Sequence, residues 1–145
     1  MPSGELVPGH GVISDDVSPL SEAQRTGLSR VVQRARSISG YCFGIYVGPL
    51  AAGRDTAIAQ HAVLPDPKSA VLVAVDPSAR AIEIVTGTTV AIDLDDRACE
   101  FATLAMKSCF QADDLVGGLR DGVTLLAEHA RAPKVLHLDK PDDPS

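Results

Sequence analysis

The chain has 145 residues with a formal net charge of −6, and 45% of its residues are apolar although only 3% are aromatic. This length is typical of one domain that can bury a single core, here built mainly from Val, Leu, Ile and Ala. The acidic balance argues against nucleic-acid binding, because phosphate contacts need clustered Lys and Arg. We interpret the densest basic region as a solvated helix face, and it carries Arg25, Arg30, Arg34 and Arg36.

No stretch approaches the roughly 20 apolar residues of a membrane-spanning helix. The first residues also lack the basic start and apolar run of a secretory signal. We therefore expect a cytoplasmic protein with no transmembrane segment. The sequence leaves the protein partner and the oligomeric state unknown.

Cysteine and histidine spacing gives no sign of a metal site or a nucleophilic triad. If Cys99 and Cys109 share one helix they lie about 15 Å apart along its axis, which is too far for a disulfide. We expect these two thiols and Cys42 to be free and buried. The four histidines lie far apart in the sequence and have no acid at a catalytic spacing.

Residues 1–19 mix Gly, Pro, Ser and Asp with isolated apolar residues and predict an irregular arm. Either Leu6 or Val12 with Ile13 could pin this arm to the domain. Ser21 and Gln24 then form the capping-box pattern of a helix N-terminus. An apolar stripe follows at helical spacing, and we expect this helix to run to about Ser37, with Gly40 ending it.

The next segments alternate between strand and helix patterns. Residues 41–47 predict a strand, within which Gly44 indicates the close approach of another backbone. Residues 54–63 predict a short helix, followed by a loop with two prolines.

The fold is organised around residues 70–75, an unbroken apolar run that predicts a strand buried on both faces. Residues 76–80 have the Asp and Pro of a tight turn. Residues 81–86 predict a second strand with Ile82 and Ile84 on one face. Its other face, with Val85, could be an exposed edge used for pairing.

For residues 88–93 the sequence does not distinguish between a short extended piece and a loop. Asp95 predicts the cap of a long helix, with Cys99, Ala102, Met106, Cys109 and Phe110 facing inward. Residues 111–113 break that helix.

Asp114 then predicts the cap of a last helix, from Leu115 to about Ala130. Gly118 and Gly122 lie on one side of it, and we interpret them as sites of tight packing.

This order of elements predicts an α/β fold, a three-layer sandwich with a small mixed sheet between helices. A crossover helix favours parallel pairing of the first two strands, and the tight turn requires an antiparallel pair. We expect one domain over residues 20–130, followed by a flexible tail over 131–145.

Three stretches resemble the TPM domain. They are the opening Leu20-Ser21-Glu22, the segment VLVAVDPSARAIEIVTG, and the segment FQADDLVGGLRDGV with its Gly-Leu-x-x-Gly-apolar pattern. The chain resembles a divergent cytoplasmic member, a bacterial relative of unknown function. The resemblance implies a Rossmann-like sheet between helices and an acidic cleft beside strand ends and helix N-termini. Some members of that family are acid phosphatases, and others look like divalent-cation binders or modulators of membrane complexes.

Acidic residues at element ends are the candidate metal ligands. Asp114, Asp96 and Asp76 could converge at one edge of the sheet and hold Ca²⁺ or Mg²⁺, which prefer carboxylate oxygens. The alternative is that these side chains serve as helix caps and turn residues. Arg80 could bind a phosphate, but we favour its pairing with Asp76 across the turn.

Two functions follow from these observations. The first is a non-catalytic TPM-like binding or regulatory domain with no cofactor. The second is a weak divalent-cation-dependent acid phosphatase that uses the three aspartates. Lys68 favours the first, because it stands in a stretch where the TPM family carries an acid. Nothing in the sequence supports nucleophilic catalysis.

Overall fold

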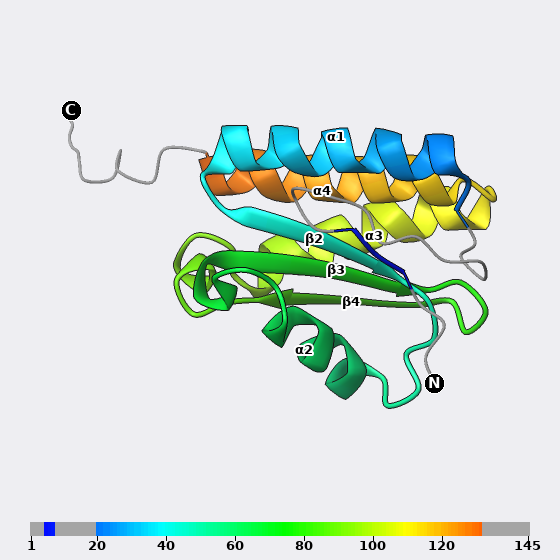
Figure 1. Cartoon of the computed structure of the whole chain (residues 1–145), viewed down its shortest axis with the longest axis horizontal. Helices are drawn as coiled ribbons and strands as arrows, with labels where there is room; N and C mark the ends of the chain where they lie inside the picture. The colour runs from blue at the N-terminus through cyan, green and yellow to red at the C-terminus, as the bar shows by residue number, and fades with distance from the viewer. Residues whose placement is uncertain (1–4, 8–19, 132–145) are drawn as a thin grey trace.

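A computed structural model of the chain describes residues 5–7 and 20–131, which form a sheet with helices on both faces (Figure 1). The helices and strands, in chain order, are β1 (Glu5–Val7), α1 (Glu22–Ser39), β2 (Cys42–Val47), α2 (Arg54–Ala62), β3 (Ala70–Asp76), β4 (Ala81–Thr86), α3 (Asp96–Gln111) and α4 (Leu115–Arg131). Two short 3-10 turns, Pro67–Ser69 and Val90–Ile92, precede β3 and α3. The remainder of the expected arm, and the expected tail beyond Arg131, lie outside the described residues.

The sheet is mixed, as predicted, and its strands lie in the order β1-β2-β3-β4. β2 and β3 are parallel, because α2 carries the chain back between them, whereas β4 pairs with β3 antiparallel through the tight turn. β1 was not predicted as a strand. It adds to the other edge of β2 with Leu6 opposite Tyr46, so this part of the arm is joined to the domain through its backbone.

The prediction that β3 is buried on both faces is confirmed. Alternate residues Val71, Val73 and Val75 belong to one apolar core, and their neighbours Leu72 and Ala74 belong to another. All five are at most 1% exposed. An antiparallel or parallel neighbour on each side satisfies the backbone of this strand, so its apolar run can be enclosed completely.

The helices α1, α3 and α4 cover one face of the sheet, and α2 covers the other (Figure 1). α1, α3 and α4 enclose the larger core, to which they contribute Leu28, Val32, Ala102, Met106 and Leu126. α2 covers the smaller core with Ala57. The expected three-layer α/β arrangement is therefore present, with the small layer of α2 opposite the three-helix layer.

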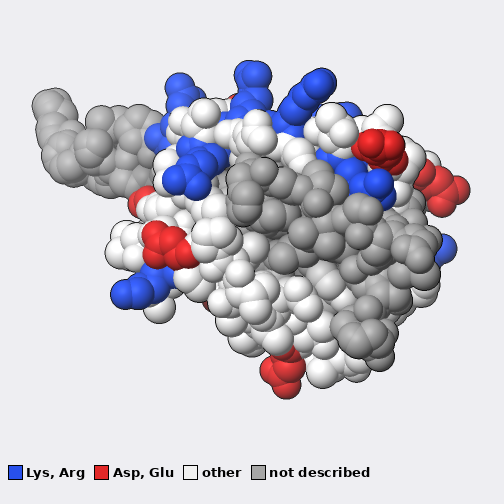
Figure 2. All heavy atoms as spheres, in the orientation of Figure 1, with Lys and Arg blue, Asp and Glu red and all other residues white. Residues whose placement is uncertain are grey.

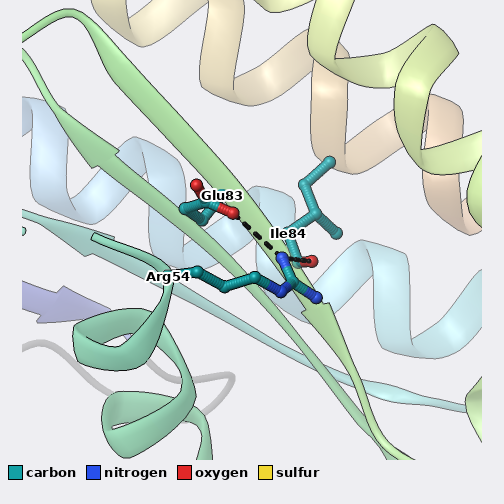
Figure 3. A network of polar contacts seen from close by, with 3 residues as sticks. All are labelled: Arg54, Glu83 and Ile84. Carbon is teal, nitrogen blue, oxygen red and sulfur yellow. Dashed lines mark hydrogen bonds and ion pairs between the residues drawn. The ribbon is translucent and has the colours of Figure 1, made fainter. Parts of the chain in front are cut away.

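β4 forms an outer edge of the described sheet, and α2 protects it. Val85 is only 7% exposed because it packs in the core under α2, so the expectation of an exposed face carrying Val85 is wrong. Arg54, at the start of α2, donates to the Glu83 carboxylate at 2.9 Å and to the backbone oxygen of Ile84 at 3.1 Å (Figure 3). The latter bond occupies a carbonyl on the strand that forms this edge of the described sheet.

The predicted helix ends are present. Ser21 and Gln24 form the reciprocal capping box, and Gly40 ends α1 in the left-handed conformation, as predicted. The last helical residue is Ser39, two residues beyond the expected Ser37. Asp95 caps α3 by accepting from the Ala98 N–H at 3.0 Å. Residues 88–93, left open by the sequence, hold the second 3-10 turn.

Two glycines of α4 allow α3 to approach closely. A Cβ built on Gly118 would lie 2.5 Å from the Phe110 ring, and one on Gly122 would lie 2.6 Å from the Met106 sulfur. The prediction of tight packing at both positions is confirmed. At Gly44 the prediction is wrong in part, because the close neighbour, at 2.8 Å, is the Leu64 side chain rather than another backbone.

Surface charge is distributed unevenly. Lys and Arg side chains gather along the edge formed by α1 (Figure 2), where Arg30, Arg34 and Arg36 are exposed on the helix. This agrees with a solvated helix face. No helix in the described part of the chain has the length and apolar character required to cross a membrane.

Candidate functional site

A cavity of about 380 Å³ opens at the carboxyl end of β3, between the β3–β4 turn and the junction of α3 with α4. We call it the hairpin pocket. Its lining residues are Val75, Pro77, Arg80, Ile82, Lys107, Phe110, Gln111, Asp113 and Leu115. The carboxyl ends of sheet strands are a common place for ligands in α/β proteins.

The apolar floor of the pocket follows directly from the strand register. Val75 and Ile82 are direct partners across the β3–β4 pair, on the face that the three-helix layer covers. Phe110, near the end of α3, and Leu115, the first residue of α4, form the opposite wall.

Both loops at the rim contain a residue in an uncommon backbone conformation. Arg80, the last residue of the β3–β4 turn, has φ of 55°, and Asp113, between α3 and α4, has φ of 61°. This left-handed region favours Gly and Asn, and a larger residue there costs about 1 kcal/mol or more. Residues in this conformation cluster at binding and catalytic sites, although Asp66, outside the pocket, adopts it as well.

The charge of the pocket differs from the acidic cleft implied by the TPM resemblance. Its charged lining residues are two cations, Arg80 and Lys107, and one carboxylate, Asp113. The expected Arg80–Asp76 pair is wrong, because in the described chain the ion pairs join Arg54 to Glu83 and Arg120 to Asp121. Arg80 lines the hairpin pocket and forms no ion pair with another described residue.

Asp76, the first of the three predicted metal ligands, lies on the other side of the sheet. Side chains alternate along a strand, so Asp76 shares the α2 face with Leu72 and Ala74. Its two carboxylate oxygens accept from the backbone N–H groups of Leu50 at 3.0 Å and Ala79 at 3.2 Å. Asp76 thus serves as a loop and turn residue.

Asp96 and Asp114 lie at opposite ends of α3. Asp96 is the first residue of this 16-residue helix, and Asp114 follows its end, so the two are about 25 Å apart. Asp114 caps α4 by accepting from the Gly117 N–H at 3.0 Å, and a Cβ at residue 117 would overlap its carboxylate. The structure does not bring the three predicted ligands together. Among the described residues, no three His, Cys, Asp or Glu side chains are grouped to hold a metal ion.

The cysteines are free, as expected, but only Cys42 is fully buried. Cys99 and Cys109 are half-buried, because they flank the inward stripe of α3 rather than lie within it. Burial, with Asp96 and Asp95 nearby, raises the pKa of the Cys99 thiol. Desolvation, together with the negative charge of Asp121, raises the pKa of the Cys109 thiol. A raised pKa disfavours the nucleophilic thiolate.

The sheet and the pocket define a small α/β domain with a ligand-sized cavity at the carboxyl end of its central strand. The chain belongs to the family described as a domain of unknown function, DUF5130, whose profile matches residues 4–127. It is 39% identical over 88 residues to two proteins of Mycobacterium tuberculosis, uncharacterized proteins MT2543 and Rv2468c. Those matches cover 59% of this chain, which spans about half the length of these curated relatives. They agree with the expected relation to a bacterial domain of unknown function.

Proposed function

We propose that this domain is a non-catalytic binding or regulatory module whose hairpin pocket takes a small organic anion with an apolar body. The observation that carries the proposal is the combination of an apolar floor with two cationic side chains in one cavity. The volume falls within the range of small-molecule sites, about 300–1,000 Å³. The site forms part of the rigid sheet and of two helix ends, so it requires little rearrangement to bind.

The lining residues suggest how such a ligand would be held. Val75, Ile82 and Phe110 offer an apolar surface for its body. The guanidinium of Arg80 suits a carboxylate or phosphate, to which it can donate two parallel hydrogen bonds, and Lys107 adds a second positive charge. The left-handed backbone of Arg80 supports this role, because glycine would relieve the strain but remove the charge.

Binding without catalysis fits the same residues. The described residues that line the pocket include one carboxylate and no Ser, Thr, Cys or His. The pairing of a Ser, Thr or Cys nucleophile with a His base, one common arrangement for covalent catalysis, therefore has no candidate among these lining residues. We also propose that the domain is related to the TPM family and that the protein is cytoplasmic.

Thermal unfolding of the full chain with matched probes tests the proposal. We expect 4-phenylbutyrate and phenyl phosphate to raise Tm, and the neutral 4-phenylbutan-1-ol to raise it much less. A ligand at 100 times its Kd adds about 2.7 kcal/mol of stability. Arg80→Gln and Lys107→Gln should each reduce the shift, whereas Arg30→Gln, exposed on α1, should leave it unchanged. Equal shifts with acid and alcohol, or no effect of either pocket variant, would overturn the proposal.

The divalent-cation-dependent phosphatase is the second candidate, which only the TPM resemblance supports. It predicts that Ca²⁺, Mg²⁺ or Mn²⁺ raises Tm, and that Asp114→Asn abolishes that rise. The hydrogen bonds of Asp76 and Asp114 to backbone N–H groups favour the structural roles of these side chains instead. Absence of any cation-dependent shift would remove this candidate and leave the binding module in place.

A further inference from the structure

A second hollow, with a volume of about 750 Å³, lies between α3 and α4. We call it the α3 groove. Its lining residues are Asp95, Arg97, Ala98, Glu100, Phe101, Leu104, Leu125, Glu128 and His129. The hairpin pocket shares none of them, so the two sites can be tested separately.

The floor of the α3 groove is unusually apolar for a surface. Phe101 and Leu104 lie three residues apart on α3 and are each 64% exposed. α3 already buries Ala102 and Met106 against α4 and the sheet. Phe101 and Leu104, together with Leu125 of α4, thus form an apolar surface outside the stripe by which α3 joins the core.

The rim of the groove carries more acid than base. Asp95, Glu100 and Glu128 surround the floor, and Arg97 is the one Lys or Arg among the described lining residues. A second copy would place this acidic rim against itself, and the chain as a whole is acidic, at −6. A basic partner would instead meet complementary charge.

We propose that the α3 groove docks an amphipathic helix of a partner protein, apolar on one face and flanked by Lys and Arg. Two helices with a groove between them can receive a third helix, whose apolar side chains at i, i+3, i+4 and i+7 enter the groove. Phe101 supplies the aromatic anchor that dominates many such interfaces. Glu100 and Glu128 pair with the basic flanks and set the choice of partner.

The test uses the full chain and a fluorescein-labelled helical peptide of 14 residues, with Leu at those spacings and Lys elsewhere. A matched peptide with Glu in place of Lys controls for apolar attraction alone. Fluorescence anisotropy should show binding of the Lys peptide, weakened by salt, and at least tenfold weaker binding of the Glu peptide.

Variants separate the groove from the rest of the surface. Phe101→Ser and Leu104→Ser should each weaken binding at least tenfold, and the double change Glu100→Gln with Glu128→Gln should reduce its salt dependence. Val63→Ser is the matched control, because Val63 is 68% exposed at the end of α2, on the opposite face of the sheet. Circular dichroism confirms that each variant folds.

Three results would overturn the proposal. One is binding that does not respond to Phe101→Ser or Leu104→Ser. Another is a dimer, seen by sedimentation, that Phe101→Ser dissociates, which would make a second copy the occupant. The third is tighter peptide binding after Leu136→Ser with Leu138→Ser, which would indicate that the chain's own C-terminal segment fills the groove.

Discussion

The backbone N–H of Leu50 donates to the carboxylate of Asp76 at 3.0 Å, which ties the loop after β2 to the end of β3. The other oxygen of the same carboxylate accepts from Ala79 within the turn. One side chain therefore fixes the relative positions of two segments that are 26 residues apart. The β3–β4 turn that carries Arg80 into the hairpin pocket depends on this arrangement.

Replacing Asp76 should destabilise the protein even without any ligand. Asp76→Ala leaves two backbone N–H groups without their acceptor, and we expect a loss of about 1–3 kcal/mol in the free energy of unfolding, measured with urea. Asp76→Asn keeps one acceptor oxygen and should lose roughly half as much. Equal stability of Asp76→Ala and the parent protein would contradict the structural role assigned to this carboxylate.

Gly122 should resist replacement by Ala, although Ala favours helices. Its missing Cβ makes room for Met106, whose sulfur would lie 2.6 Å from the added carbon, so we expect Gly122→Ala to destabilise by about 1–3 kcal/mol. Gly27, inside α1, has no atom within 4 Å of such a Cβ. Gly27→Ala should therefore stabilise by about 0.5–1 kcal/mol. A lower Tm for Gly122→Ala together with a higher Tm for Gly27→Ala would support the packing argument. A higher Tm for both variants would refute it.

Local signals were sufficient for most of the fold. The capping box at Ser21, the apolar run of β3 and the Asp–Pro turn each act over a few residues, so the sequence predicts them directly. β1 could not be predicted because it is three residues long and exists only through pairing with β2. The burial of Val85 likewise depends on α2, which is distant in sequence.

The candidate sites were harder to predict because each of them combines distant segments. From the sequence alone, Arg80 is a possible phosphate ligand, but its closeness to Asp76 in the chain favours a pair between these two residues. Lys107 and Phe110 reach the pocket only because α3 ends beside the β3–β4 turn. The aspartates gave a misleading signal, because a carboxylate that caps a helix looks the same in sequence as one that binds a metal ion.

The contact between Arg54 and Glu83 should contribute little to stability by itself. Their side chains are 54% and 29% exposed, and exposed pairs typically contribute about 0.2–1 kcal/mol. A double-mutant cycle with Arg54→Met and Glu83→Gln should give a coupling energy in that range, which falls as salt is added. The same cycle for Arg120 and Asp121, adjacent residues whose side chains are 3.7 Å apart, should give no measurable coupling energy. A coupling near 3 kcal/mol for the first pair would mean that it is far better shielded than its exposure indicates.

Tyr41 should make the protein lose stability at high pH. Its hydroxyl donates to Asp93 Oδ2 at 2.5 Å, and this bond, with burial and the negative charge of Asp93, raises the pKa of Tyr41 to about 12 from an ordinary value of 10.0. Below pH 10 the folded and unfolded chains both keep the proton, so the contribution is complete there. Between about pH 10 and 12 the unfolded chain loses the proton and the folded chain retains it, so stability falls as pH rises.

Tyr41→Phe isolates this effect. The variant lacks the hydrogen bond and should be less stable at pH 7, but its stability should decline less steeply between pH 10 and 12, as measured by urea unfolding at each pH. Tyr46→Phe is a useful comparison, because burial also raises the pKa of Tyr46, whose hydroxyl donates to the Pro49 carbonyl. Asp93→Asn keeps an acceptor but removes the charge, so tyrosinate absorbance should then report a lower pKa for Tyr41. Parallel pH profiles for the parent protein and Tyr41→Phe would show that Asp93 does not hold the Tyr41 proton in solution.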